Sequence, residues 1–136
     1  MAGQRIINDD KFECSNLINR IIEYFTVFYT DSSKVDVLMV VCKFEGIDLY
    51  QRFFLDATLG FWEEFCKVDA FEDLDDLELT DFMSEFNFQG ELISKIICST
   101  SKNEFAKIKF YINGITFTLK YSNNEDTDSD IIIEKI

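Results

Sequence analysis

Carboxylates are the most numerous side chains in this chain that could do chemistry, and they gather in one stretch. Residues 68–86, VDAFEDLDDLELTDFMSEF, contain no Lys or Arg and carry eight acids, which are Asp69, Glu72, Asp73, Asp75, Asp76, Glu78, Asp81 and Glu85. Carboxylates can act as general acids and bases or hold Mg²⁺, but such sites draw several of them together from different elements. Acids that follow one another along a single segment are typical of a solvated face. We therefore expect no enzyme and no metal site.

Other common catalytic groups are missing from the sequence. The chain has no His, which excludes imidazole bases, Ser-His-Asp and Cys-His pairs and His-bound metals. Its five glycines are isolated, so no phosphate-binding loop can be drawn. Asp126, Asp128 and Asp130 match the first half of a calcium loop, but Ile131 stands where that loop needs Gly. We interpret this segment as a solvated loop and expect no cofactor.

The cysteines favour a reducing compartment. All four have apolar neighbours and none forms a CxxC pair; they are Cys14, Cys42, Cys66 and Cys98. Two disulfides in a secreted protein are the alternative, but four buried thiols fit these surroundings better. The first fifteen residues are polar, and no apolar run approaches the roughly 18 residues of a membrane span. These features predict a cytoplasmic protein without a signal peptide.

The net charge narrows the class of partner. The chain has 26 acidic and 13 basic residues, for a net charge of −13. Residues 63–91 hold eleven of the acids against Lys67 alone, so this stretch carries −10 of that total. A negative field repels nucleic-acid phosphates and anionic membranes and attracts basic proteins. We therefore expect a basic protein partner, with no direct binding of nucleic acid and no membrane contact.

The elements that must position these residues are read from the apolar spacing. Residues 9–30 place apolar side chains at helical intervals after an N-cap at Asn8 or Asp9, which predicts an amphipathic helix. Residues 34–46 and 49–57 are β-branched or alternating and predict two antiparallel strands. Residues 59–68 return to helical spacing, and residues 80–86 predict a short helix capped by Thr80. The acidic stretch thus lies in a helical insert.

The last third of the chain reads as strands. Residues 104–112 and 115–122 alternate apolar and polar side chains around Asn113 and Gly114, which predict a type I′ hairpin turn. Residues 91–99 and 131–136 predict two more strands. We expect one α+β domain over residues 1–136. In it, an N-terminal amphipathic helix packs on a mainly antiparallel sheet of about six strands, with the helical acidic insert between strands 2 and 3.

Acids interleaved with Phe and Leu have two interpretations. The acidic stretch is either an ordinary amphipathic surface or a protein interface, in which charge speeds association and apolar anchors slow dissociation. The candidate anchors are Trp62, Phe71 and Phe86. In size, acidity and lack of catalytic residues the chain resembles immunity proteins that neutralise nuclease-type toxins, a resemblance of character that rests on no motif. It implies an inhibitor that blocks the positive groove of a basic enzyme.

Two other classes share part of this character. A phage-encoded nucleic-acid mimic that inhibits host restriction or CRISPR machinery would use the same negative surface. An acidic secretion chaperone is also small and cytoplasmic and begins with an amphipathic helix followed by strands, but this chain lacks the closing helix expected of that class. The direction of the carboxylates discriminates between functions: outward as one patch favours an inhibitor, and inward from several elements favours an enzyme. The sequence does not determine the oligomeric state.

Overall fold

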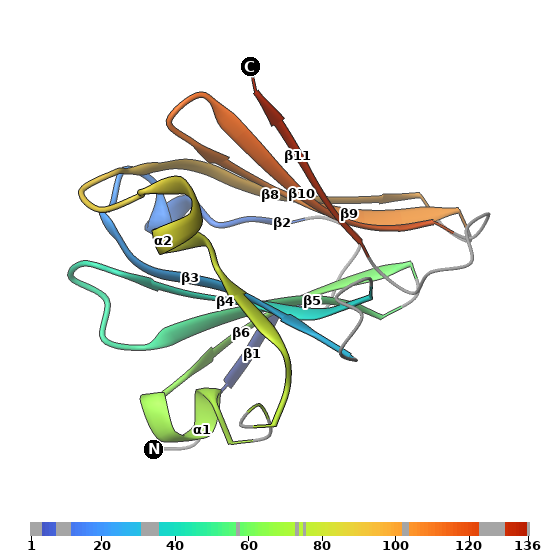
Figure 1. Cartoon of the computed structure of the whole chain (residues 1–136). Coiled ribbons are helices and arrows are strands. Elements are labelled where there is room, and N and C mark those ends of the chain that lie inside the picture. Colours follow the sequence, from blue (N-terminus) through green and yellow to red (C-terminus); the bar gives the residue numbers. More distant parts are fainter. Residues whose placement is uncertain are drawn as a thin grey trace.

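A computed structural model of the chain shows two antiparallel β-sheets packed face to face (Figure 1). It describes residues 4–7, 12–30, 36–56, 58–72, 74, 76–101, 104–122 and 130–135. These residues form eleven strands in a six-stranded and a five-stranded sheet, which we name sheet A and sheet B. The fold is therefore mostly β, and the predicted α+β class with one sheet of about six strands is wrong.

The strands follow one another across each sheet in a fixed order. Sheet A runs β1 (Gln4–Ile7), β6 (Leu59–Phe65), β5 (Tyr50–Asp56), β4 (Val37–Phe44), β3 (Ile22–Tyr29) and β7 (Leu79–Asp81). Sheet B runs β11 (Asp130–Lys135), β10 (Ile115–Ser122), β9 (Phe105–Ile112), β8 (Ile93–Ser101) and β2 (Phe12–Glu13). The short helices are η1 (Ser15–Leu17), α1 (Lys67–Ala70) and α2 (Phe82–Phe86). Every strand pairing is antiparallel.

The hairpin of β9 and β10 confirms the prediction for residues 104–122. Asn113 and Gly114 have φ values of 47° and 75°, the two positive angles that a type I′ turn requires. The turn pairs Ile112 with Ile115 and sets the register of both strands. Alternate residues of β9 are buried, as a half-buried strand demands.

Aromatic rings hold the two sheets together. Phe25 on β3 lies 5.3 Å from Phe110 and 5.5 Å from Phe117, both on sheet B, measured between ring centroids. Phe82 of α2 stacks on the same Phe25 ring at 5.6 Å. Phe53 on β5 meets the Phe110 ring edge-on at 5.2 Å. One apolar core therefore fills the space between the sheets and extends under α2, which lies at one end of the sandwich (Figure 1).

The predicted N-terminal helix is wrong. In the described part of residues 9–30, the chain forms β2, the single turn η1 and then β3. The sequence of β3, IEYFTVFY, is β-branched or aromatic and buried at nearly every position, so its apolar spacing fits a strand covered on both faces as well as a helix. In the structure, β3 pairs with β4 on one side and with β7 on the other, so this segment is a strand.

The predicted helix at residues 59–68 is also wrong over most of its length. Residues 59–65 form β6, which pairs with β5 from Asp56↔Leu59 to Tyr50↔Phe65, and α1 is only four residues long. The acidic stretch therefore follows a strand, and its described residues form the end of α1, turns, β7 and α2 instead of one helical insert. The predicted helix at residues 80–86 exists as α2, but Asp81 caps it and Thr80 belongs to β7.

Substitution of Gly60 tests whether residues 59–65 form a strand or a helix, because the two structures predict opposite changes in the free energy of unfolding. A Cβ at Gly60 would overlap the Sγ atom of Cys98 on β8 across the core, and that cysteine is 1% exposed. We predict that Gly60→Ala lowers the free energy of unfolding by about 1–3 kcal/mol. In a helix the same change would stabilise by about 1 kcal/mol. Denaturant unfolding measures the difference.

A double-mutant cycle supplies the control. Cys98→Ala should recover most of the stability lost in Gly60→Ala, because it removes the overlapping sulfur. A Gly60→Ala protein that is more stable than the wild type, or additive effects of the two changes, would contradict the packing of β6 on β8.

Candidate functional site

The segment between β6 and β7, residues 66–78, crosses the outer face of sheet A, and we name it the acidic crossover. β6 lies next to one edge of sheet A and β7 forms the opposite edge, so the connection must pass over β5, β4 and β3. Figure 1 shows α1 on the side of sheet A that faces away from sheet B. The crossover therefore covers the face of sheet A that the main core does not use.

A second apolar cluster holds the crossover on the sheet. The Phe71 ring meets the rings of Tyr24 and Tyr50 edge-on at centroid distances of 5.6 and 5.2 Å. Leu74 is fully buried against Phe28 and the neighbouring residues of β4. These contacts exist because β3 and β4 carry apolar side chains on both faces, and they fix the path of the crossover.

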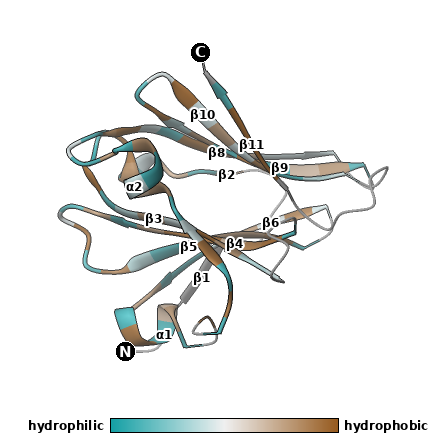
Figure 2. Cartoon of the chain, in the orientation of Figure 1, coloured by the Kyte–Doolittle hydropathy of each residue, from teal (hydrophilic) through white to brown (hydrophobic). Residues whose placement is uncertain are grey.

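The local turns direct the acids to solvent. Backbone N–H groups of Leu74 and Leu77 donate to the carbonyls of Phe71 and Leu74, at 3.1 and 3.2 Å. These turns repeat every three residues, so the apolar side chains fall on the side that faces the sheet. Between them, Glu72 and Asp76 are exposed, and Figure 2 shows both hydrophobic and hydrophilic residues along α1 and the chain that follows it.

Most of the predicted acids are exposed. Of the eight, five are exposed and Asp69 is partly exposed; the five are Glu72, Asp76, Glu78, Asp81 and Glu85. Asp73 and Asp75 lie outside the described residues. Within the described chain no Lys or Arg forms an ion pair with any of the six. This surface therefore carries negative charge that the described part of the chain does not neutralise.

Asp81 has a structural role as well as a charge. Its Oδ1 atom accepts a hydrogen bond from the Met83 N–H at 2.9 Å, and the Ser84 hydroxyl donates to its Oδ2 atom at 3.2 Å. These bonds satisfy groups at the start of α2 that have no partner within the helix. Next to it, the Tyr29 hydroxyl donates to Thr80 Oγ1 at 3.0 Å and ties β7 to β3.

The three predicted apolar anchors lie at different depths. Trp62 is 5% exposed, and its Nε1–H donates to Gln51 Oε1 at 2.7 Å inside the core. Phe86 is partly buried and packs on the rings of Phe88 and Phe117. Phe71, which belongs to the crossover, is partly buried against sheet A. Their role in partner binding stays a prediction, and Trp62 offers little surface for it.

Two exposed apolar residues of the same region were missed by sequence reasoning. Val68 is 77% exposed and Leu79 is 44% exposed, so both reach solvent more than the predicted anchors do. Val68, Phe71 and Glu72 help line a shallow depression of about 470 Å³. The only sequence signal for Val68 is an apolar residue between two charged ones, Lys67 and Asp69.

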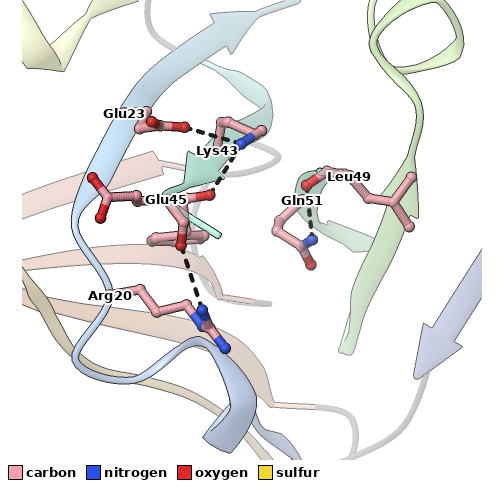
Figure 3. A network of polar contacts seen from close by, with 7 residues as sticks. Arg20, Glu23, Lys43, Glu45, Leu49 and Gln51 are labelled. Carbon is pink, nitrogen blue, oxygen red and sulfur yellow. Dashed lines mark hydrogen bonds and ion pairs between the residues drawn. The ribbon is translucent and has the colours of Figure 1, made fainter. Parts of the chain in front are cut away.

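A second acidic hollow lies at the end of the sandwich near α2. It has a volume of about 490 Å³ and is lined partly by Glu23, Glu45 and Asn87. Here Glu23 forms an ion pair, because Lys43 Nζ donates to its carboxylate at 2.9 Å, whereas Arg20 donates at 3.4 Å to the backbone carbonyl of Glu45 and not to its carboxylate (Figure 3). These bonds hold the loops of the sandwich end together. The acidic crossover, whose acids lack such partners among the described residues, is the better candidate for an interface.

The buried thiols are poor nucleophiles. Burial raises the pKa of the Cys14 thiol, and the nearby Cys42 and Cys98 raise it further. Burial also raises the pKa of Cys42 well above its ordinary value. Because the thiolate is the reactive form, Cys14 and Cys42 stay protonated and inert at neutral pH. They serve the core as small apolar residues.

Comparison with known proteins adds no homologue. No family model, no curated protein and no solved structure matches the chain. The part of the chain that the structure describes contains no helix with the length and apolar character needed to span a bilayer. In the same part, no three Cys, Asp or Glu side chains are placed so that they could hold a metal ion together.

Stability measurements can separate the structural role of Asp81, as the cap of α2, from its contribution to the negative surface. We predict that Asp81→Ala lowers the free energy of unfolding by about 0.5–2 kcal/mol, because it removes the cap of α2, and that Asp81→Asn restores most of the loss. Glu78→Ala is the matched control; its side chain is exposed, and its removal should change stability by less than about 0.5 kcal/mol. Equal stability of Asp81→Ala and Glu78→Ala in denaturant unfolding would contradict the capping role.

Proposed function

We propose that this protein binds a basic protein partner through the acidic crossover and inhibits it, as an immunity protein that neutralises a nuclease-type toxin. One observation carries the proposal. Described acids of the crossover and of the adjoining β7 and α2 reach solvent, have no ion-pair partner among the described residues, and sit on a segment that aromatic packing fixes in place. The arrangement is charged, exposed and preorganised.

Electrostatics explains why such a surface suits this partner. Like charges held close together destabilise a free protein by self-repulsion, and a cationic partner relieves that repulsion. The groove of a nuclease must be positive to bind phosphates, so a protein that blocks it is expected to be negative. Charge raises the rate of association, and exposed apolar residues such as Val68 and Leu79 slow dissociation once water is excluded.

A non-enzymatic role fits the direction of the acids. The described acids of the crossover and α2 reach solvent along one segment, whereas acid–base or metal catalysis needs carboxylates that converge in a cleft. We propose no direct contact with nucleic acid or membrane, since the same negative surface repels both.

The proposed compartment is the cytoplasm. All four cysteines are free thiols, and three of them are buried. Free buried thiols suit a reducing environment, in which disulfides do not persist. An immunity protein would meet its toxin in this compartment, where nucleic acid is also present.

The alternatives now differ in support. A nucleic-acid mimic that acts on host restriction or CRISPR machinery would use the same surface, so the identity of the captured partner discriminates between the two. A secretion chaperone was favoured by an amphipathic first helix, and residues 22–29 form β3 instead. That alternative loses its main structural support.

Charge reversal tests the proposal. The test variant carries Glu72→Lys, Asp76→Lys and Glu78→Lys, and the control variant carries Glu13→Lys, Asp48→Lys and Asp56→Lys, which are exposed acids elsewhere on the fold. Both change the net charge equally. We predict that the wild type and the control capture a basic nuclease from a lysate of the native source at low salt and inhibit it once it is purified, whereas the test variant does neither. Its melting temperature should be equal or higher, because repulsion is relieved.

Two outcomes would contradict the proposal. Equal inhibition by the test and control variants would show that the acidic crossover is not the binding surface. A collapse of the melting temperature of the test variant, with inhibition retained by the molecules that stay folded, would show that the acids are structural.

A further inference from the structure

Sheet B carries a group of lysines on its outer face, which points away from the acidic crossover. Lys107 and Lys109 lie on β9 and Lys120 on β10, at positions that alternate with the buried core residues of both strands. Figure 1 shows that sheet B lies on the opposite side of the sandwich from α1. In a chain of net charge −13, three neighbouring lysines on one face are a marked exception.

The strand register places the three lysines around one threonine. Lys120 stands directly opposite Lys107, and Thr118 stands directly opposite Lys109. Because side chains two residues apart on a strand share a face, these four residues form two adjacent cross-strand pairs on the outer face. Like charges directly across a strand pair are destabilising, so the free protein bears a cost at this position.

The three lysines line a small hollow that also contains one carboxylate, that of Glu134. The hollow has a volume of about 180 Å³ and is lined by all four residues of the two cross-strand pairs together with Ile132 and Glu134. Among the described residues, none of the three lysines forms an ion pair. In the register, Asp130 stands opposite Lys120, whereas Lys107 and Lys109 stand opposite Ser99 and Ile97, which carry no charge.

The buried hydroxyl of Thr118 supports a binding site independently of the lysines. Thr118 lines the hollow and is 4% exposed, and its buried hydroxyl has no hydrogen-bond partner among the described residues. The neighbouring Thr116 hydroxyl, by contrast, donates to the Glu134 carbonyl at 3.4 Å. A buried hydroxyl without a partner is unfavourable, so a ligand that accepts its hydrogen bond binds more tightly than the charge interactions alone would allow.

We propose that this hollow binds a single oxyanion of the phosphate or sulfate type, held by Lys107, Lys109 and Lys120 and by a hydrogen bond from the Thr118 hydroxyl. Ammonium groups bind phosphate as point charges, and a tetrahedral oxyanion has enough oxygens to meet several donors at once. The overall negative charge of the chain repels a long polyanion, so the ligand is a small isolated anion. The site is independent of partner binding, since it lies on the other face.

Inorganic phosphate and sulfate are the probes, each compared with chloride at the same ionic strength. We predict that phosphate or sulfate raises the melting temperature of the full chain in a saturable way and shifts backbone amide NMR signals of β9 and β10, and that chloride does neither. Lys109→Gln should weaken this binding about tenfold or more. Lys67→Gln, an exposed lysine on the other face with the same change in charge, should leave it unchanged.

Thr118→Val separates the hydroxyl from the charges. This change keeps the shape of the side chain, so the variant should fold with equal or higher stability without phosphate and bind phosphate more weakly. Binding that is equal in Lys109→Gln and Lys67→Gln, a response to chloride as large as that to phosphate, or full affinity in Thr118→Val would overturn the proposed site.

Discussion

Burial of apolar side chains on both faces of sheet A is the constraint on which the structure depends. On the inner face, Phe25 and its neighbours pack against sheet B and form the main core. On the outer face, Phe28 and Tyr24 need a cover of their own, and the acidic crossover supplies it through Phe71 and Leu74. Because Phe71 and Leu74 face the sheet, the described acids beside them, Glu72 and Asp76, are held toward water. The acidic surface is thus a consequence of a sheet that is apolar on both sides.

Sequence reasoning identified the antiparallel strands predicted at residues 34–46 and 49–57, which are β4 and β5, and the hairpin that follows later in the chain. The strict alternation of residues 105–112 and the Asn113–Gly114 turn identify their hairpin from local pattern alone. It failed at residues 22–29 and 59–65, where apolar side chains occur on both faces and helical and strand spacing cannot be told apart. The pairing of strands into two sheets is non-local and leaves no short-range signal. For the site, the exposed acids could be inferred from composition, but the exposure of Val68 and the role of Phe71 required the fold.

The two faces of the sandwich have opposite electrostatic character. The crossover presents acids without ion-pair partners among the described residues, and the outer face of sheet B presents three lysines around Thr118. Each arrangement costs stability in the free protein, since like charges lie close together, and a ligand of opposite sign would relieve that cost. The large aromatic core offsets these costs by removing apolar surface from water. The fold thus allows two separate charged surfaces on one small chain.

The central claim is that the outward acids of the crossover steer a cationic partner. The most direct test is the association rate constant of the chain with the basic protein proposed as its partner, measured by stopped-flow mixing over a range of ionic strength. We predict that this rate constant falls steeply as salt rises from low to physiological concentration, where charges beyond about 8 Å are screened, while the dissociation rate constant changes little. An association rate constant that does not depend on salt would contradict the claim.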